Sequence, residues 1–446
     1  RYPFGFGLSY TTFEITSSEF TADGKNITAG ITVKNTGSVP GKEVVQAYFS
    51  APQGKLGKPA RELCGFAKTG VLQPGETERL TVTIPVESLA SYDDSGVTGH
   101  RYCWLLEAGE YRFYVGTDVR SAAEKFTAEI PETVVKQCRS ALAPVTEFRR
   151  MKNDGGKPAY EEVPLTNDPD PHSRAKLPEE LPQTGDRGIK LADVYRGKNT
   201  LEEFTAQLSD YDLSCIIRGE GMGSPKVTAG TAAAFGGVSD ELKAMGVPCG
   251  CCSDGPSGMR LDCGTKAFSL PNGTLLASTF NRELMTELFS YMGLELPANH
   301  VDCLLGPGMN IHRHPLNGRN FEYFSEDPLL TGEIAAAELR GMHTAGVTGT
   351  IKHFCGNNRE TRRHTLDSVI SERALREIYL RGFKIAVDEG GADSVMTTYG
   401  MVNGVWTGAN YDLNTLILRE DWGYTGFTMT DWWANLNRRG QAPDKN

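Results

Sequence analysis

The amino-acid sequence predicts a multidomain protein: a β-sandwich followed by a (β/α)8 barrel of the TIM type that lacks its last unit. Two observations carry this prediction. From Phe13 to about Ile130, apolar residues alternate with polar ones, as in half-buried strands. From about Asn199 onward, short apolar runs alternate with helix patterns instead. The length of 446 residues agrees with two or three domains of about 150 residues each.

The first domain, residues 13–135, has the strand and turn signals of an antiparallel sandwich. Ile31 and Val33 alternate with polar neighbours, and so do Tyr111 and Phe113. The sequence "QPGE" at 73–76 is a turn signal between two such strands. The spacing of strands and turns predicts a β-sandwich of roughly immunoglobulin or fibronectin type III size.

Residues 136–198 are predicted to be an extended linker. Seven prolines lie between positions 140 and 185 together with many charges and few large apolar groups, at positions 144, 158, 164, 169, 171, 178 and 182. Such a segment runs over a surface rather than forming a core.

The remaining residues, 199–446, are predicted to form the barrel with its strands 1–7. Thr200 with Glu203 is a capping-box pattern, and Asp327 before Pro328 is a second helix start. Ser371 opens a further helix, in which Leu375, Ile378, Tyr379 and Phe383 are expected to share one face. The strand candidates between the helices are residues 213–218, 247–252, 274–278, 303–306, 349–354, 394–399 and 427–431.

Composition excludes several classes of function. The net charge is −10 with a pI near 5.5, and the basic residues are scattered, so neither nucleic acid nor an anionic membrane surface is an expected partner. No apolar run is long enough to span a bilayer. The ten cysteines lack the pattern of a disulfide framework and indicate free thiols in a reducing, cytoplasmic compartment. Since the sequence starts at Arg1 without Met, it does not exclude secretion.

The ends of five predicted strands carry the polar groups that would face a barrel active site. Carboxylates and guanidinium groups bind pairs of sugar hydroxyls, and an indole stacks on the apolar face of a pyranose. An aspartate beside Tyr399 and Lys352 is expected to stay ionised, as a nucleophile attacking an anomeric carbon must. The polar and aromatic residues at these ends are Asp254, Arg260, Arg319, Glu322, Lys352, His353, Met396, Tyr399, Asp431 and Trp432.

Five motifs make the sequence recognisable: "DGPSGMR", "GRNFEYFSEDP", "KHFCGNNRE", "MTTYGMVNG" and "GFTMTDWW". Segment by segment they resemble the barrel domain of family 3 glycoside hydrolases of the β-glucosidase type. The leading "RYPFGFGLSYTTFE" is similar to the stretch that joins that family's α/β sandwich domain to its fibronectin type III domain. Residues 1–12 are therefore expected to be a junction from a preceding domain. The order departs from the common one and resembles that of circularly permuted members.

The resemblance implies a role for each matching residue. Asp431 would be the nucleophile that forms the glycosyl-enzyme, and Trp432 part of the wall beside it. Tyr399 would orient the nucleophile, and Met396 would line the pocket. The hydroxyl-binding residues would be Asp254, Arg260, Arg319, Lys352 and His353. Neither a metal nor an organic cofactor is implied.

The resemblance also implies what else the active unit contains. A retaining enzyme needs a second carboxyl group about 5–5.5 Å from the nucleophile. In the family this acid/base Glu belongs to the α/β sandwich domain, and no glutamate here matches its motif; Glu322 is expected to be structural. The expected partners are a β-glucoside substrate, the glucose product, and a complementing segment or polypeptide that carries this domain. The barrel's eighth unit is expected beyond Asn446, and a homo-oligomer is compatible with the sequence.

Other functions are weighed against this one. β-N-acetylhexosaminidases of the family carry a "KHFPGHGDT" motif that is absent here, and its β-xylosidases tend to have Glu where Asp254 stands. A β-xylosidase or an exo-β-glucanase is the alternative within the family, and an inactive sugar-binding fragment is the alternative for the isolated chain. His312 and His314 have a metal-like spacing, and Lys352 could serve as a Schiff-base lysine.

Overall fold

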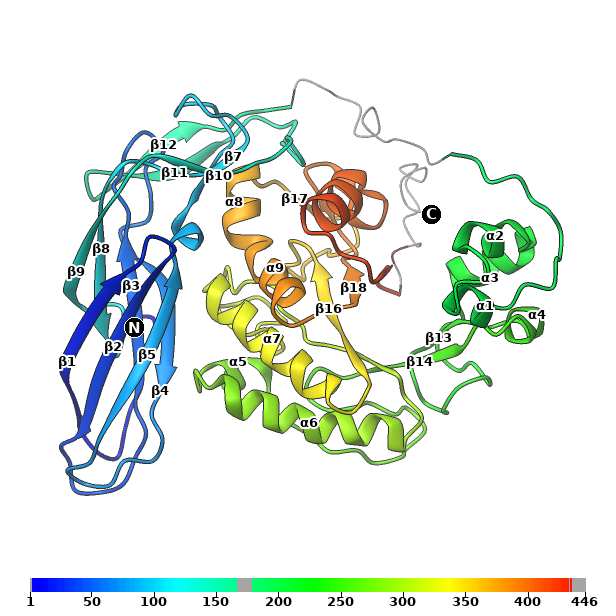
Figure 1. Ribbon diagram of the computed structural model, residues 1–446, viewed down its shortest axis with the longest axis horizontal. Coiled ribbons are helices and arrows are strands. Elements are labelled where there is room, and N and C mark those ends of the chain that lie inside the picture. The colour runs from blue at the N-terminus through cyan, green and yellow to red at the C-terminus, as the bar shows by residue number, and fades with distance from the viewer. Residues whose placement is uncertain (1, 167–178, 433, 435–446) are drawn as a thin grey trace.

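The structure, a computed structural model, describes residues 2–166, 179–432 and 434. A β-sandwich and an α/β unit lie side by side, and helices α1–α4 stand on the opposite side of the α/β unit (Figure 1). The predicted order, sandwich first and barrel-like domain second, is confirmed. None of the helices in the described part of the chain combines the length and apolar character needed to cross a bilayer.

Two antiparallel sheets form the sandwich. One contains β1 (Phe13–Ala22), β2 (Asn26–Asn35) and β5 (Thr77–Pro85), and the other contains β3 (Val44–Ser50), β4 (Glu62–Lys68), β8 (Gly109–Gly116) and β9 (Ala123–Ile130). The alternating residues face inward as predicted, because Ile31, Val33, Tyr111 and Phe113 are all buried. A short helix, η1 (Val86–Leu89), and a third sheet follow, the latter made of β6 (Ser91–Asp93), β7 (Cys103–Leu106) and β10 (Thr133–Gln137).

The segment predicted to be an extended linker is not extended throughout. Strands β11 (Arg149–Asp154) and β12 (Lys157–Glu162) pair as a hairpin, and α1 (Leu191–Tyr195) is helical. The prediction was wrong there because Gly155 and Gly156, both with positive φ, supply a hairpin turn that the prolines obscured. Three of the seven prolines, at positions 169, 171 and 178, lie outside the described residues.

A six-stranded sheet forms the core of the second domain. Neighbouring strands in this sheet run parallel, except for the first two strands, which are antiparallel. In order across the sheet the strands are β13 (Ala233–Gly236), β14 (Cys249–Asp254), β15 (Cys303–Leu305), β16 (Thr348–Phe354), β18 (Ser394–Thr397) and β21 (Phe427–Met429). The rings of Phe235 on β13 and Phe427 on β21 stack at 5.0 Å, so the sheet curls until its two outermost described strands meet.

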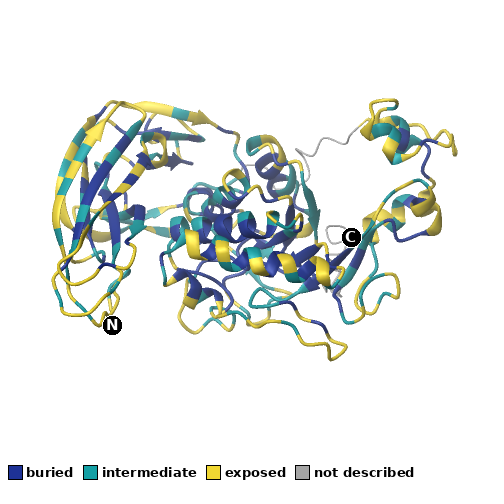
Figure 2. Ribbon diagram, turned by 60° about the horizontal axis from the view of Figure 1, so that its bottom comes forward, coloured by how far each residue is buried: buried dark blue, intermediate teal, exposed yellow. Residues whose placement is uncertain are grey.

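Helices cover the outside of this sheet. The ribbon coloured by burial shows their inner faces buried and their outer faces exposed (Figure 2). They are α5 (Gly273–Ala277), α6 (Arg282–Ala298), α7 (Pro328–His343), α8 (Glu372–Ala374), α9 (Arg381–Asp388) and the π-helices η2 (Leu375–Tyr379) and η4 (Asp412–Asp421). A small sheet near the strand ends contains β17 (Asp367–Ser368), β19 (Met401–Val402) and β20 (Val405–Trp406), followed by η3 (Thr407–Ala409).

Five of the seven predicted strands are confirmed and two were wrong. Residues 213–218 belong to α3 (Asp210–Arg218), because the side chain of Ser209 accepts a hydrogen bond from Asp212 N and caps a helix. Residues 274–278 begin in α5, which the side chain of Asn272 caps in the same way. The prediction missed β13, whose small residues "AAFG" carry little strand signal.

The predicted helix starts at Thr200, Asp327 and Ser371 are confirmed. Thr200 caps α2 (Leu201–Ala206), and Asp327 accepts from Leu330 N at the start of α7. The helix face predicted after Ser371 was partly wrong. The π-helical turn η2 shifts the spacing, so Leu375 and Phe383 are buried while Ile378 is exposed. A further short helix, α4 (Asp240–Ala244), follows α3 and β13.

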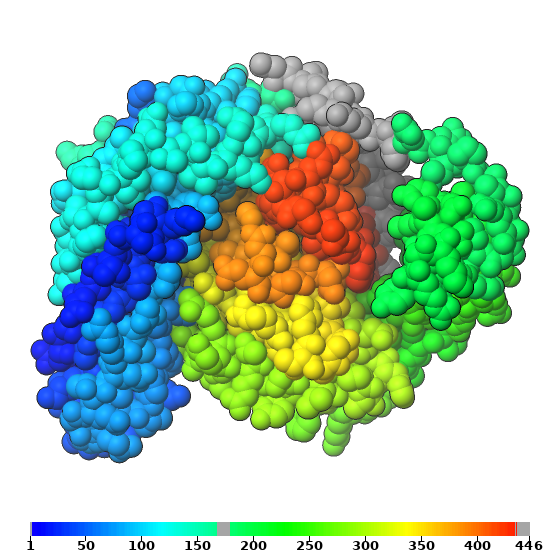
Figure 3. Space-filling model, viewed as in Figure 1, coloured from blue at the N-terminus to red at the C-terminus, as the bar shows by residue number. Residues whose placement is uncertain are grey.

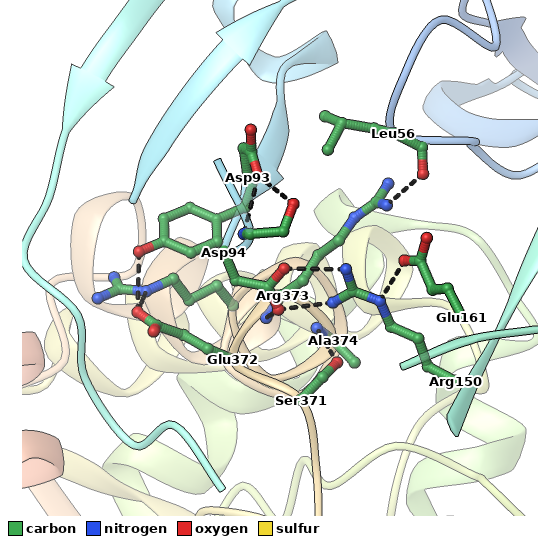
Figure 4. A network of polar contacts seen from close by, with 12 residues as sticks. Leu56, Asp93, Asp94, Arg150, Glu161, Ser371, Glu372, Arg373 and Ala374 are labelled. Atoms are coloured by element: carbon green, nitrogen blue, oxygen red, sulfur yellow. Dashed lines mark hydrogen bonds and ion pairs between the residues drawn. The ribbon is translucent and has the colours of Figure 1, made fainter. Parts of the chain in front are cut away.

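A polar network fixes the sandwich to the second domain (Figure 4). Arg150 of the hairpin binds Asp94 of the sandwich, with Nη2 2.9 Å from Oδ1. Arg373 of α8 donates to the carbonyl oxygens of Leu56 and Gly57 at 2.8 and 3.1 Å. The space-filling view shows sandwich atoms packed along one side of the second domain (Figure 3). Arg150 and Arg373 therefore tie the hairpin and the second domain, respectively, to the sandwich.

Candidate active site

All nine predicted site residues line one pocket. The pocket encloses about 260 Å3 and lies at the C-terminal ends of the barrel strands. Asp254 is the last residue of β14, and Lys352 and His353 come just before Phe354, the last residue of β16. Tyr399 and Asp431 each follow their strand by two residues. The remaining predicted residues in the lining are Arg260, Arg319, Met396 and Trp432.

Asp431 is a buried carboxylate held by two hydrogen bonds. Its Oδ1 accepts from the backbone N–H of Trp432 at 2.8 Å, and Tyr399 donates to it as well. Burial raises the pKa of Asp431 above its usual range, while the charge of Lys352 and these two hydrogen bonds pull in the opposite direction. The group thus combines partial desolvation with stabilisation of its ionised form, which suits a carboxylate nucleophile.

Lys352 holds two further carboxylates. Its Nζ lies 3.0 Å from Asp254 Oδ1 and 3.6 Å from Glu322 Oε1. Burial opposes the ionisation of Asp254, but the charge and hydrogen bond of Lys352 outweigh it and hold the pKa of that carboxyl below its usual range. An ammonium engaged by two carboxylates is disfavoured as a Schiff-base nucleophile. Glu322 takes the structural position expected of it.

Arg260 reaches the same carboxylate from the pocket mouth. Its Nη1 lies 3.5 Å from Asp254 Oδ2, and its Nε and Nη2 fork onto Asp262 at 2.8 Å each. The bidentate contact fixes the plane of the guanidinium. Donors and acceptors therefore alternate along this wall, which matches vicinal sugar hydroxyls.

Consecutive residues on a regular strand point to opposite faces, yet Lys352 and His353 both line the pocket. The register between β16 and β18 shifts between Lys352 and Phe354, and this irregularity turns both side chains inward. Burial, followed by the nearby charges of Arg319 and Lys352, lowers the pKa of His353 well below its usual range. The imidazole is therefore neutral.

A neutral imidazole has one acceptor and one donor nitrogen, and the neighbours of His353 assign them. Arg319 Nη2, which can only donate, lies 3.0 Å from Nε2. Nδ1 is then the protonated nitrogen and donates to the hydroxyl of Tyr323 at 3.2 Å. Arg319 is itself fixed by Glu322, with contacts of 2.7 and 3.0 Å.

One wall of the pocket is apolar. Trp432, Met396 and Leu305 belong to a cluster inside the curled sheet, and the indole Nε1 of Trp432 donates to the carbonyl of Ala232 at 3.0 Å. This bond fixes the indole plane beside Asp431. Such a face can stack on the C–H groups of a pyranose.

The prediction missed six lining residues: Met222, Gly230, Ala232, Asp262, Leu305 and Arg363. Arg363 could have been predicted, because it follows Glu360 by three residues in the loop after a strand end. In the structure the two side chains form an ion pair at 3.0 Å. Its guanidinium lies 4.7 Å from the centre of the Tyr399 ring. Gly230 and Ala232 carry no chemical signal that a sequence could show.

His312 and His314, whose spacing resembles that of metal ligands, do not form part of a cluster of metal-binding side chains among the described residues. Neither residue lines the pocket, and in the described ranges no three His, Cys, Asp or Glu side chains converge as metal ligands would. The carboxylates in the described lining are Asp254, Asp262 and Asp431, with no glutamate among them. The pocket thus presents a sugar-binding constellation around one buried carboxylate.

Comparison with known proteins agrees with these features. Residues 184–443 match the family model described as "Glycosyl hydrolase family 3 N terminal domain", and residues 43–119 match "Fibronectin type III-like domain". A beta-glucosidase of Ruminococcus albus is 65% identical over 449 residues, covering 100% of this chain and 47% of the relative. Beta-glucosidase A of Butyrivibrio fibrisolvens is 41% identical over 479 residues, covering 97% and 56%.

A solved structure is similar throughout. The beta-glucosidase of Paenibacillus barengoltzii superposes with a TM-score of 0.93 at 53% identity, over 97% of this chain and 48% of that one. The chain thus spans about half the length of these relatives. The family match extends over more than half of the chain, and its two models occur in the order that the structure shows, sandwich first. The chain therefore belongs to glycosyl hydrolase family 3.

Proposed function

We propose that the protein is a retaining β-glucosidase that releases glucose from the non-reducing ends of β-linked glucosides, with Asp431 as its nucleophile. The observation that carries this proposal is the buried carboxylate of Asp431, held by Tyr399 and the Trp432 backbone in a pocket of sugar-binding groups. The relatives named above, each called a beta-glucosidase, support the substrate class.

In the first step, a carboxylate oxygen of Asp431 attacks the anomeric carbon and the bond to the leaving oxygen breaks. That oxygen takes a proton from a general acid, and a glycosyl ester forms on Asp431. In the second step, the conjugate base of the acid removes a proton from water, which attacks the same carbon and frees the carboxylate. Two inversions give a β-configured glucose product.

The other pocket residues position the sugar and its developing charge. Asp254 and Lys352 present an acceptor and a donor side by side, which suits a pair of adjacent hydroxyls. Arg319 contacts neutral His353, whose Nε2 lies 3.6 Å from Asp431 Oδ2, and it shares Glu322 with Lys352. The indole of Trp432 provides the stacking face.

The general acid is proposed to come from polypeptide outside these 446 residues. Two observations support this. Among the described residues, no glutamate lines the pocket, and Glu322 is committed to Arg319 and Lys352. The relatives are about twice as long as this chain, so they contain as much sequence again that could supply it.

Covalent trapping tests the nucleophile. We expect a 2-deoxy-2-fluoroglucoside with a good leaving group to add one sugar to the protein, because the fluorine slows hydrolysis of the glycosyl-enzyme. Peptide mass spectrometry should find the sugar on Asp431. The Asp431→Asn variant should not be labelled, whereas Asp262→Asn, a matched change at the pocket mouth, should be. A sugar found on Asp254 or elsewhere would refute the assignment.

Comparing two substrates on the 446-residue chain tests the origin of the acid. An aryl glucoside with a good leaving group needs little protonation, while cellobiose needs a full general acid. We expect the isolated chain to cleave only the aryl glucoside. Equal efficiency on both would show that the acid lies within these residues.

A further inference from the structure

The backbone of Lys352 and His353 departs from a regular strand in the direction of its hydrogen bonds. In a regular strand, consecutive residues turn their N–H and C=O groups to opposite neighbours. Here both residues turn them to the same side. Lys352 N donates to the carbonyl of Pro307 at 3.0 Å, and the carbonyl of Lys352 accepts from Met309 N at 2.7 Å. His353 turns its two backbone groups toward the next residue of that segment, Asn310.

The side chain of Asn310 takes the place of a strand partner for His353. Its Oδ1 accepts from His353 N at 2.9 Å, and its Nδ2 donates to the His353 carbonyl at 2.8 Å. Both residues are 2% exposed. A backbone N–H only donates and a carbonyl only accepts, so the two contacts fix which end of the carboxamide carries the oxygen. Asn310 thus satisfies two buried backbone groups at once.

The strand on the other side of β16 is in register with the neighbours of His353. Lys352 is the register partner of Met396 on β18, and Phe354 is the partner of Thr397, the next residue of that strand. The register shifts between these two pairs, and His353 falls in the shift. The carboxamide of Asn310 is therefore the group that holds the backbone of His353 within this irregular stretch.

The irregular stretch matters because it gives the pocket two adjacent side chains from one strand. Lys352 Nζ reaches Asp254 Oδ1 at 3.0 Å, and the ring of His353 contacts Arg319 and Tyr323. If this stretch were a regular strand, one of the two side chains would point to the opposite face of the sheet. Either the lysine or the histidine would then be lost from the pocket.

We propose that Asn310 is a positioning residue for the glycosidase reaction: its carboxamide keeps the backbone at His353 in the form that turns both Lys352 and His353 toward the sugar. This inference rests on the proposed function. Asn310 itself does not line the sugar pocket, so it acts through these two residues and not on the substrate. Loss of its bonds should change sugar binding as well as stability, because a displacement of about 1 Å at a positioned group can lower a rate by about 10²-fold.

The first test replaces one of the two hydrogen bonds in the enzyme expressed from its complete gene. Asn310→Asp keeps the shape of the side chain and the oxygen that accepts from His353 N. Its second oxygen faces the His353 carbonyl and can donate to it only when the carboxyl group is protonated. At pH 7 we expect kcat/KM for cellobiose to fall by about 10-fold or more, with a matching rise in the inhibition constant of glucose.

Lowering the pH should restore the activity of Asn310→Asp relative to the unaltered enzyme. The charges of Arg319, Lys352 and Arg363 act on the site of His353 and favour an ionised carboxyl there, whereas burial favours the protonated form. Near Lys352 and Arg319, burial already raises the pKa of Asp431 above its usual range. We expect the same balance for a carboxyl at position 310, so the ratio of the two activities should rise from pH 7 to pH 4.

Two further variants separate positioning from stability. Asn310→Ser removes both bonds without adding a charge, and it should show the same loss of kcat/KM with no recovery at low pH. Asn403 makes the same pair of bonds, at 2.8 Å each, to the backbone N–H and carbonyl of Ile370, and it does not line the sugar pocket. Asn403→Asp should therefore lower the unfolding temperature but leave KM and glucose inhibition nearly unchanged. Unchanged KM and glucose inhibition in both Asn310 variants would overturn the proposal, since Asn310 would then support the fold alone.

A crystal structure of either Asn310 variant at pH 7 tests the positioning without any measurement of activity. We expect Lys352 Nζ to leave Asp254, or the ring of His353 to leave Arg319. Retention of both contacts would overturn the proposal while leaving the proposed function intact. Absence of glucosidase activity in the unaltered enzyme would instead refute the proposed function, whatever the crystal structures show.

Discussion

The ammonium nitrogen of Lys352 lies 3.0 Å from Oδ1 of Asp254 and so joins the ends of β16 and β14, which are separated in the sheet by β15. Lys352 is almost completely buried, while the carboxylate of Asp254 is 38% exposed. The pair is therefore partly open to the pocket, where a sugar can reach it.

Lys352→Gln should weaken both sugar binding and the fold. The pKa of Asp254 should rise, because the charge that holds it below its usual range is removed. We expect unfolding to become easier by about 1–3 kcal/mol, less than for a fully enclosed pair because water reaches Asp254. Glucose affinity measured by calorimetry should fall at least about 10-fold. Unchanged glucose affinity would show that Lys352 stabilises the fold but does not contribute to sugar binding.

Tyr399→Phe should move the acidic limb of the pH–rate profile to higher pH. The hydrogen bond from Tyr399 lowers the pKa of Asp431 against the larger effect of burial, so its loss raises that pKa further. A higher pKa means that the carboxylate becomes ionised only at higher pH. The measurement is kcat/KM for an aryl glucoside from pH 4 to 8. An acidic limb that stays in place would separate Tyr399 from the ionisation of Asp431.

Asp431→Asn should abolish turnover, by about 10³-fold or more, without destabilising the protein. Because the pKa of Asp431 is raised in the folded state, its contribution favours folding below the unfolded pKa and is lost as pH rises through the folded value. The asparagine variant should therefore unfold at an equal or higher temperature than the unaltered chain at pH 7. That difference should shrink toward pH 4. A variant that unfolds much earlier at pH 7 would contradict this account.

Glu338→Met should stabilise the protein at neutral and alkaline pH. Glu338 of α7 is 1% exposed, and its Oε1 has no hydrogen-bond partner among the described residues. Burial raises the pKa of this carboxyl well above its usual range. Its contribution to folding is therefore present at low pH and is lost as pH rises through the raised value. We expect a gain of about 1–3 kcal/mol in urea unfolding at high pH, and a stability that depends less on pH.

Arg373→Met should loosen the sandwich from the barrel. The guanidinium bridges the carbonyls of Leu56 and Gly57 and the carboxylate of Glu377, so its removal leaves buried acceptors without donors. A cost of about 2–4 kcal/mol is expected in urea unfolding followed by tryptophan fluorescence. Arg79→Met is the matched control, because its pair with Glu19 is exposed and should contribute less than about 1 kcal/mol.

More of the lining of the candidate site than of the fold could be predicted from the sequence. Parallel strands place their C-terminal ends at one edge, so the polar residues after successive apolar runs had to meet, and Asp254, Lys352 and Asp431 do line one pocket. Apart from Leu305, which is the last residue of β15, the lining residues that were missed lie outside the named strands and helices. Met222 and Asp262 lie in irregular segments that bring them to the pocket, and the pattern of apolar residues does not predict the course of such segments.

The two strand predictions that were wrong share one physical cause. A short apolar run fits a strand or a buried helix equally well, and only its boundaries decide. At residues 213–218 the deciding signal was Ser209 with Asp212, a cap that precedes the run by several positions. For Ile378 the cause was different, since a π-helical turn changes the spacing that the helix-face argument assumes.

The hydrogen bond between Trp432 and Ala232, inside the curled sheet, affects when the active site forms during folding. The bond from Trp432 to Ala232 joins residues 200 positions apart in the sequence, so it forms only after a very long loop has closed. Loops of this length close late, and contacts between distant residues slow folding. The orientation of Trp432 beside Asp431 should therefore be among the last features to appear during refolding and among the first to be lost on warming, and catalytic activity should vanish before the helices α6 and α7 melt.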